Sequence, residues 1–308
     1  MPLRELKLND GNVIPASASI AYGCGTAWYG ATGNDGISRP LVDAIKLALE
    51  TGFTHIDEAE AYSNEKSAGV AWKEAGVPRE SIYITTKVLG GIGNIQETIR
   101  RQLKELQTDY VDQYLVHSPA FSKFLKGQAN IPTLSECWAE MEAVKAAGLA
   151  KSIGISNYRV ADIKAVLEHA KVKPAVNQIE YHPYITDTTS DIVELCQREG
   201  ILVSAYAPSL PVVHRPDGPL KPVLAELAES MSKERGKPVT PGQILLKWVQ
   251  AQDIMPVTTS TKQSRMEEYL DIANIRSLTQ EEVQKIRTVG KELQHSQYMM
   301  NMAPLQSK

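Results

Sequence analysis

The sequence contains few cysteines and no long apolar run, and these absences exclude several classes of protein. Its three cysteines, Cys24, Cys137 and Cys196, are scattered along 308 residues and form no C-x-x-C pair. Neither a disulfide framework nor a zinc motif is therefore indicated. No apolar run approaches the roughly 20 residues that a membrane-spanning helix needs, and the polar start lacks the apolar core of a signal peptide. We expect a cytoplasmic protein in a reducing compartment.

An excess of positive charge is also missing. The net charge is −3, so neither nucleic acid nor an anionic membrane is favoured as a partner. A hydrophobic content of 43% with 22% charged residues is that of an ordinary soluble globular protein. The length allows one large domain or two smaller ones.

Among the residues that are present, Asp57, Tyr62 and Lys87 stand out because they follow two consecutive predicted strands. The first strand runs into Asp57, and Tyr62 comes five positions later. A helix that Asn64 can cap follows, and the next strand delivers Lys87. Parallel strands joined by a crossover helix end on the same face, so the three side chains can converge.

Convergence of these groups would favour proton transfer. An ammonium beside a phenol favours the phenolate and is expected to lower the phenol pKa from its reference of about 10. A carboxylate beside the ammonium keeps it charged and aimed. A phenol tuned in this way can give a proton to a carbonyl oxygen near neutral pH. Taken singly, each residue is more simply interpreted as part of a surface ion pair or as a loop tyrosine.

The chain predicts an N-terminal hairpin around Asp10-Gly11, followed by strands that alternate with helices. The expected strands cover residues 17–23, 53–57, 82–87, 110–117, 151–156, 174–180, 201–206 and 254–258. The expected helices cover residues 38–51, 64–75, 95–106, 133–147, 160–170, 188–198, 223–235, 241–251, 264–272 and 279–293. Residues 89–93 and the proline-rich stretch 208–222 are expected to be loops, and the tail from Gln294 to be loose.

Even spacing of about 25–30 residues per unit, with no linker, predicts a single domain over residues 1–308. An open doubly wound sheet could alternate in the same way. Eight units favour a closed (β/α)8 TIM barrel with extra C-terminal helices, and in such barrels the active site lies at the C-terminal ends of the strands. His117 stands at such an end. Asn177 and Gln178 are amides in a strand that otherwise reads as buried, and a ligand amide is one partner they could have.

Other motifs point away from common nucleotide and metal sites. Gly23-Cys24-Gly25-Thr26 lacks the third glycine of a dinucleotide fingerprint, so these glycines more simply let the backbone approach a ligand or a neighbouring strand. Residues 89–93 lack the Lys-Ser/Thr of a phosphate loop. Only His117 is placed for a ligand cluster, so no metal site is predicted.

Several segments together resemble the aldo-keto reductase superfamily, over nearly the whole chain. They are G-F-T-H-I-D-E-A-E-A-Y-S-N-E (52–65), I-T-T-K (84–87), Y-L-V-H-S-P (114–119), G-I-S-N-Y (154–158) and N-Q-I-E-Y-H-P-Y (177–184). The resemblance implies a barrel that binds NADPH without a Rossmann motif and reduces a small-molecule carbonyl compound. A monomer or weak homodimer is expected.

The resemblance also implies a role for each site residue. Tyr62 would be the general acid, tuned by Lys87 and Asp57, and His117 would orient the carbonyl group. Ser156, Asn157 and Gln178 would hold the carboxamide of the nicotinamide, and Tyr206 would stack on its ring. The residues expected to contact the cofactor are Gly25, Thr26, Ser156, Asn157, Gln178, Tyr206, Ser260, Thr261, Lys262 and Arg265.

The chain departs from the family pattern at two places. Many members carry a tryptophan after the histidine, where this chain has Ser118; this should widen the substrate pocket, which Trp28 would also line. Many read Pro-Lys-Ser before the adenosine site, where this chain reads P-V-T-T-S-T-K-Q-S-R (256–265). Lys262 and Arg265 could still clamp a 2′-phosphate, with hydroxyl groups beside them. These variants are similar to fungal ketone reductases that act on α-keto amides, diketones and keto-lactones.

Two other functions are compatible with the same fold. One is a cofactor-binding regulatory protein similar to the β subunits of potassium channels, and the other is a metal-dependent hydrolase. The complete set of Asp57, Tyr62, Lys87 and His117 favours an enzyme over the regulatory protein. The hydrolase would need more metal ligands at the strand ends than His117 alone.

Overall fold

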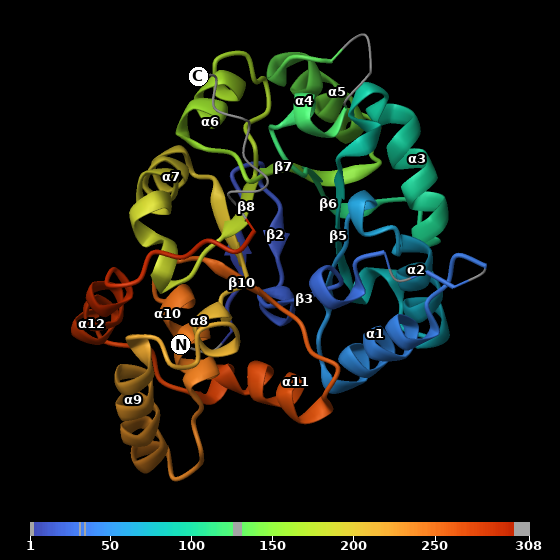
Figure 1. Ribbon diagram of the computed structural model, residues 1–308. Helices are drawn as coiled ribbons and strands as arrows, with labels where there is room; N and C mark the ends of the chain where they lie inside the picture. The colour runs from blue at the N-terminus through green and yellow to red at the C-terminus, as the bar shows by residue number, and fades with distance from the viewer. Residues whose placement is uncertain (1–2, 31, 34, 126–130, 299–308) are drawn as a thin grey trace.

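A closed parallel barrel forms the centre of the computed structural model, which describes residues 3–30, 32–33, 35–125 and 131–298. The strands follow one another around the barrel in the order β10-β3-β4-β5-β6-β7-β8-β9 (Figure 1). This closure excludes the open doubly wound sheet and confirms the predicted TIM barrel. It also brings the C-terminal ends of all eight strands to one face.

The barrel strands are short and deeply buried. They are β3 (Ala21–Gly23), β4 (His55–Asp57), β5 (Tyr83–Val88), β6 (Val111–Val116), β7 (Ala150–Ser156), β8 (Val176–Glu180), β9 (Leu202–Tyr206) and β10 (Met255–Thr258). Every residue of β5 and β6 is buried, as expected for parallel strands that are covered on both faces. The first barrel strand begins later than predicted, because residues 16–18 form a turn of 3₁₀ helix.

Helices form a ring around the strands (Figure 1). They are α1 (Arg39–Thr51), α2 (Glu65–Glu74), α3 (Ile95–Leu106), α4 (Phe121–Phe124), α5 (Leu134–Ala146), α6 (Val160–Leu167), α7 (Thr186–Glu199), α8 (Leu210–Val213), α9 (Leu220–Arg235), α10 (Pro241–Gln250), α11 (Gln263–Leu270) and α12 (Gln280–Gly290). As predicted, Gly52 ends α1 in the left-handed conformation, with φ 117°, and Thr279 and Glu282 form a capping box. Within the described ranges, no helix has the length and apolar character needed to cross a membrane.

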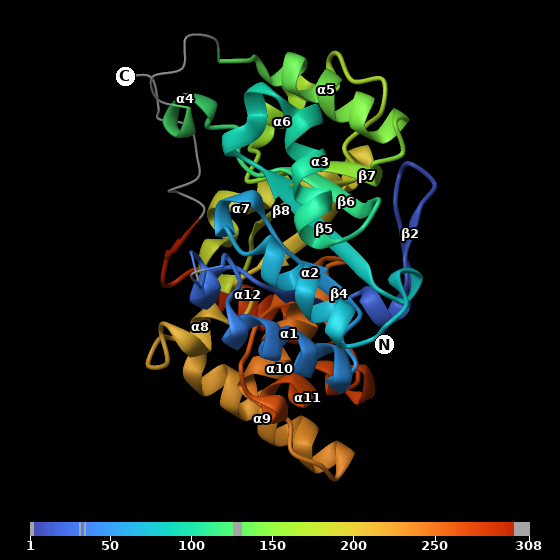
Figure 2. The ribbon, with the colours of Figure 1, turned by 90° about the vertical axis from the view of Figure 1, so that its right-hand side faces the viewer.

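The predicted hairpin covers the N-terminal end of the barrel. Its strands are β1 (Leu6–Lys7) and β2 (Val13–Ile14). Between them, the Asn12 amide donates to the carbonyl of Lys151 at 2.9 Å and to the Ser152 hydroxyl at 3.0 Å, both at the start of β7. Figure 2 shows the hairpin at one end of the molecule and the last described residues at the opposite end.

Two segments differ from their predicted loop conformation. The stretch 208–222 contains α8 and the first turn of α9. Residues 90–93 form a 3₁₀ turn next to a carboxylate of Glu60, which accepts hydrogen bonds from the backbone of Leu89 at 2.8 Å and Gly91 at 3.0 Å. The carboxylate lies far from this turn in the sequence, so no local pattern indicated the ordering.

The tail is also ordered up to Tyr298. The buried carboxylate of Glu180, at the end of β8, accepts hydrogen bonds from the Ser296 hydroxyl at 2.9 Å and from the backbone N–H groups of Gln297 at 2.8 Å and Tyr298 at 2.9 Å. It also contacts His182 Nε2 at 3.1 Å. The expectation of a loose tail is therefore wrong for residues 296–298, and its remainder, 299–308, lies outside the described residues.

Candidate active site

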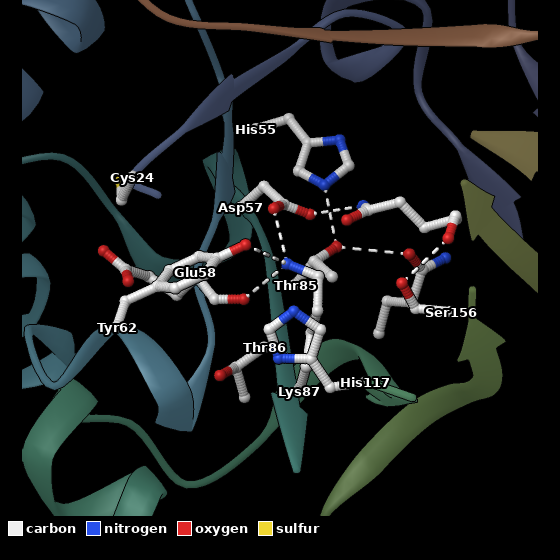
Figure 3. Close-up of polar contacts among 12 residues, drawn as sticks. Cys24, His55, Asp57, Glu58, Tyr62, Thr85, Thr86, Lys87, His117 and Ser156 are labelled. Carbon is white, nitrogen blue, oxygen red and sulfur yellow. Dashed lines mark hydrogen bonds and ion pairs between the residues drawn. The ribbon is translucent and has the colours of Figure 1, made fainter. Parts of the chain in front are cut away.

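Asp57, Tyr62 and Lys87 converge at the C-terminal face of the barrel, as predicted (Figure 3). Asp57 ends β4, Lys87 is the penultimate residue of β5, and Tyr62 lies in a short 3₁₀ turn, Glu60–Tyr62. The Lys87 ammonium donates to Asp57 Oδ1 at 2.6 Å and to the carbonyl oxygen of Glu58 at 2.8 Å. Its nitrogen is 3.5 Å from the Tyr62 hydroxyl oxygen. The ammonium therefore joins an acid to a phenol.

The Asp57–Lys87 pair is almost completely removed from water. The side chain of Lys87 is 0% exposed and that of Asp57 is 3% exposed. Burial opposes the charge on Lys87, but the nearby Asp57 outweighs it, and the pKa of the ammonium is raised. Lys87 is consequently charged at neutral pH.

The pKa of Tyr62 is raised, which is the opposite of the predicted direction. Burial is the largest influence and raises the pKa of Tyr62 to about 12, whereas the Lys87 ammonium lowers it only in part. The predicted lowering is therefore wrong, because removing a phenolate from water outweighs an ammonium 3.5 Å away. Tyr62 carries its proton at neutral pH, which is the state that a proton donor requires.

Gly25 makes room for this phenol. A Cβ atom at position 25 would lie 2.9 Å from Tyr62 Cζ and 3.1 Å from its hydroxyl oxygen. The glycine therefore permits a close approach to Tyr62, whatever it also contacts in a cofactor.

Four of the six non-glycine residues with left-handed backbone in the described ranges lie on the same face. These residues are Thr26, Ser63, Asn157 and Ala207, with φ of 43°, 56°, 62° and 55°. Each follows the C-terminal end of a barrel strand. Non-glycine residues held in this region carry strain of about 1–3 kcal/mol each, and such strain collects at functional sites.

His117 follows β6 and faces Tyr62. Their rings meet edge to face, with centroids 5.6 Å apart at 84°. Burial and the Lys87 charge hold the pKa of His117 well below its usual range, so the imidazole is neutral. Its Nδ1 has no partner among the residues that the structure describes. A neutral imidazole placed here can donate one N–H to a carbonyl oxygen.

The residues expected to hold the nicotinamide also come together, and they are bonded to one another. The Tyr206 hydroxyl donates to Asn157 Oδ1 at 2.8 Å, and Asn157 Nδ2 donates to the carbonyl of His117 at 3.0 Å. The Ser156 hydroxyl donates to the backbone carbonyl of Gln178 at 2.8 Å. These contacts join β6, β7, β8 and β9 at their C-terminal ends into one polar network.

Two further features of this face, one contact and one buried residue, are not among the predictions from the sequence. The Gln178 amide donates to Asp57 Oδ2 at 2.7 Å, which connects the nicotinamide-side residues to the Asp57–Lys87 pair across the barrel. Glu58, directly after Asp57, is fully buried, and the sequence alone predicts no role for it. Asn177, in contrast, donates to the carbonyl of Tyr158 at 3.1 Å, so the protein itself satisfies this amide donor.

The residues predicted to shape the substrate pocket lie near the same face. Ser118 is buried, and its hydroxyl accepts a hydrogen bond from the Ala120 backbone at 3.1 Å. Trp28 is half-buried, and its indole nitrogen has no hydrogen-bond partner within the described part of the chain. Tyr298, from the tail, meets Tyr206 edge to face with ring centroids 6.2 Å apart.

The stretch 258–265, predicted to bind the 2′-phosphate, runs from the end of β10 into α11, and its residues 261–265 are exposed. The Ser260 carbonyl accepts a hydrogen bond from Tyr22 at 2.9 Å, and its hydroxyl accepts one from the Lys262 backbone at 3.0 Å. Lys262 precedes α11 as its N-cap, and Arg265 lies in the first turn. Thr261, Lys262 and Arg265 are exposed.

Arg265 lies on the wall of a cavity of about 430 Å³ that residues of α8, α9, α10 and α11 also line. Glu268 shares this wall and accepts a hydrogen bond from the Thr240 hydroxyl at 2.5 Å. Two cations and two hydroxyl groups at the start of a helix are a donor set that fits a phosphate ester. The residues at the start of α11 therefore fit the phosphate ester of a phosphorylated cofactor.

Comparisons with known proteins identify relatives of this chain by sequence and by fold. The sequence model of the aldo/keto reductase family matches residues 23–291. An NAD/NADP-dependent indole-3-acetaldehyde reductase of Schizosaccharomyces pombe is 40% identical over 282 residues, which cover 92% of this chain and 95% of that protein. An NADPH-dependent alpha-keto amide reductase of Saccharomyces cerevisiae is 38% identical over 294 residues, covering 92% and 90%. The crystal structure of an aldo-keto reductase of Bombyx mori in complex with NADP has a TM-score of 0.83 at 31% identity and covers 99% of this chain and 98% of that one.

Proposed function

Because the chain belongs to the aldo/keto reductase family and is therefore an oxidoreductase, we propose that it reduces a ketone or aldehyde to an alcohol with NADPH and that Tyr62 is its general acid. The observation that carries the proposal is the Lys87 ammonium, which is bonded to Asp57 at 2.6 Å and lies 3.5 Å from the Tyr62 hydroxyl. NADPH, when bound, supplies the hydride.

In the proposed reaction each side chain has one task. Tyr62 gives its phenolic proton to the carbonyl oxygen of the substrate, and Lys87 offsets the charge that remains on the phenolate. Asp57 keeps Lys87 charged and aimed. His117, neutral and facing Tyr62, donates an N–H to the same oxygen and so orients the carbonyl group. The buried position of the Asp57–Lys87 pair strengthens these electrostatic effects.

We assign cofactor binding to two groups of residues. Ser156, Asn157, Gln178 and Tyr206 would hold the nicotinamide, after exchanging some of their present hydrogen bonds for the carboxamide. The preference for NADPH over NADH would come from cations at the start of α11, above all Arg265. The substrate class that we favour is an α-dicarbonyl, an α-keto amide or a keto-lactone, which is supported by the His-Ser-Pro sequence and by the alpha-keto amide reductase among the relatives.

The variant Tyr62→Phe tests the general acid. Turnover should fall by about 10²–10⁴-fold, because the proton donor is lost with little change in bulk, and NADPH binding should stay nearly unchanged. Tyr29→Phe is the matched control, since Tyr29 is 66% exposed and its ring lies 6.1 Å from that of Tyr62. Near-normal turnover of Tyr62→Phe with a panel of ketones and aldehydes would rule out this role.

A further inference from the structure

Glu58 is a buried carboxyl group next to the reacting residues, and the thiol of Cys24, a weak donor, lies beside it. Its side chain is 0% exposed, and neither carboxyl oxygen has a partner in hydrogen-bond geometry among the described residues. Its backbone is fully used: the N–H donates to the carbonyl of Thr85 at 2.8 Å, and the C=O accepts the Lys87 ammonium at 2.8 Å. Figure 3 shows the side chain pointing away from Lys87, on the side of Cys24 and Tyr62. A carboxylate here would be a buried charge without a counter-charge of its own.

The charged and titratable groups around Glu58 explain which state it prefers. They come from β3 and the segment after it, β4, β5, the 3₁₀ turn and α2, and are Tyr22, Cys24, Asp57, Tyr62, Glu65 and Lys87. Burial is the largest influence and raises the pKa of Glu58 to about 8, and Glu65 and Asp57 add to the rise. The nearby thiol of Cys24 and the charge of Lys87 oppose it without cancelling it. Glu58 is therefore mostly neutral at pH 7.

Glu65 offers a contrast within the same layer of the fold. It is also buried, but its Oε1 accepts hydrogen bonds from the hydroxyl of Thr86 and from the Gln102 amide, the latter at 2.9 Å. Gln102 also donates to the carbonyl of Lys87 at 3.1 Å. The charges that act on the phenol of Tyr62 are Lys87, Asp57 and Glu58, in that order. Glu65 is thus a buried glutamate near Lys87 that has its own donors.

We propose that Glu58 is a positioning residue for the reaction: it holds a proton in the resting protein, and when it releases that proton to solvent, the new negative charge makes Tyr62 hold its phenolic proton more tightly. The inference rests on the proposed function, since Glu58 acts only through Tyr62. Glu58 ionises before Tyr62 does, because the pKa of Glu58 is about 8 and that of Tyr62 is about 12.

The direction of catalysis follows from this order of ionisation. Carbonyl reduction needs a protonated Tyr62, whereas alcohol oxidation needs the phenolate. Above pH 8 the charge on Glu58 opposes formation of the phenolate and so suppresses oxidation more than reduction. Glu58 therefore keeps the site in its reductive form under alkaline conditions.

The test is the pH profile of Glu58→Gln, which keeps the shape of the side chain and cannot ionise. We expect the apparent pKa for alcohol oxidation, measured as kcat/KM between pH 6 and 11, to fall by up to about one unit relative to the unchanged protein. Glu65→Gln is the matched control: Glu58 can still ionise in this variant, so its apparent pKa for oxidation should stay above that of Glu58→Gln. Coincident profiles for all three proteins would overturn the role of Glu58. Absence of any carbonyl reduction by the unchanged protein would overturn the proposed function first, and this inference with it.

Thermal unfolding gives a second readout that does not depend on catalysis. The pKa of Glu58 in the folded protein is raised above its ordinary value, so its contribution to stability is full at low pH and is lost as pH rises from about 4.5 to about 8. The Tm of Glu58→Gln should therefore rise relative to the Tm of the unchanged protein as pH increases from 5 to 9. A constant difference would overturn the protonated resting state. If the difference in Tm grows with pH but the oxidation profile of Glu58→Gln is not shifted, Glu58 is protonated at rest but is not coupled to Tyr62. Only the coupling would then be overturned.

Discussion

The two ends of the candidate site differ in how far they are assembled before anything binds. At the reacting end, Asp57 and Lys87 are at most 3% exposed and are already bonded. At the phosphate end, Thr261, Lys262 and Arg265 are exposed. Dipoles and charges lower a reaction barrier most when they are already in place and need no rearrangement. The buried Asp57–Lys87 pair meets this condition. Exposed cations steer and hold an anion without being fixed beforehand, which suits the phosphate end.

Strand register explains much of this difference. Asp57 pairs with Gly23 on one side and Thr85 on the other, and Lys87 pairs with Leu115, so the barrel holds both side chains. The phosphate end follows β10 as a loop, which the hydrogen bond from Tyr22 to the Ser260 carbonyl ties to the barrel. The comparison predicts that substitutions at the reacting end affect folding and turnover together, whereas those at the phosphate end affect affinity only.

The largest effect is expected from Lys87→Met, which leaves Asp57 as a buried charge without its cation. Breaking a buried pair costs about 3–5 kcal/mol, so the free energy of unfolding should fall by that amount, and turnover should be lost. Urea denaturation measures the first and NADPH oxidation the second. Lys151→Met is the control, because Lys151 is 50% exposed where it pairs with Asp112 and should cost no more than about 1 kcal/mol. Equal losses for both variants would show that the reacting end is not specially assembled.

Gly25→Ala tests whether the position of Tyr62 matters apart from its chemistry. The added Cβ would push on the phenol from 2.9 Å, and a displacement of this kind can lower turnover by about 10²-fold with the fold intact. Gly90→Ala is the matched control, since its new Cβ would come no closer than 3.8 Å to Glu60. We would measure kcat alongside the circular dichroism spectrum. Unchanged kcat in Gly25→Ala would mean that the phenol has room to move.

Arg265→Ala tests the phosphate end. The loss of a charge-assisted contact should weaken NADPH binding by about 10–100-fold and leave NADH almost unaffected. Titration of both cofactors, followed by quenching of tryptophan fluorescence, measures this. Arg198→Ala, with a side chain 66% exposed on α7, controls for loss of surface charge. If NADH and NADPH weaken in parallel, Arg265 does not recognise the 2′-phosphate.

Ser118→Trp should have the smallest effect, and it concerns the predicted substrate pocket. We expect KM for bulky cyclic diketones to rise several-fold more than KM for small aldehydes, because an indole would fill space that Ser118 leaves. Ser118 is buried and its hydroxyl accepts a bond from Ala120, so Tm is measured as well. Equal changes in both KM values would mean that this residue does not line the pocket.

The barrel and the convergence of Asp57, Tyr62 and Lys87 could be predicted because both follow from local patterns. Alternating strands and helices give a closed barrel, and residues at strand ends share a face. The sign of the Tyr62 pKa shift could not be predicted, since desolvation depends on the packing of Gly25 and its neighbours. The bond from Gln178 to Asp57 crosses the barrel over 121 positions and leaves no sequence pattern.

The roles of the individual site residues, the single domain over residues 1–308 and the cytoplasmic location remain predictions. The composition of the tail predicts a loose segment, whereas Tyr298 is held by a hydrogen bond to Glu180. Composition carries no information about such a distant acceptor.

The hydrogen bonds between the Glu180 carboxylate and residues 296–298 have a consequence for directed evolution. Two of its bonds use the backbone N–H groups of Gln297 and Tyr298, which every amino acid except proline provides. Side chains at these two positions can thus be randomised without removing either bond. The ring of Tyr298 lies beside Tyr206, so such a library would vary the wall of the site on a fixed main chain. Substrate range could then be altered at 297 and 298 before any buried residue is changed.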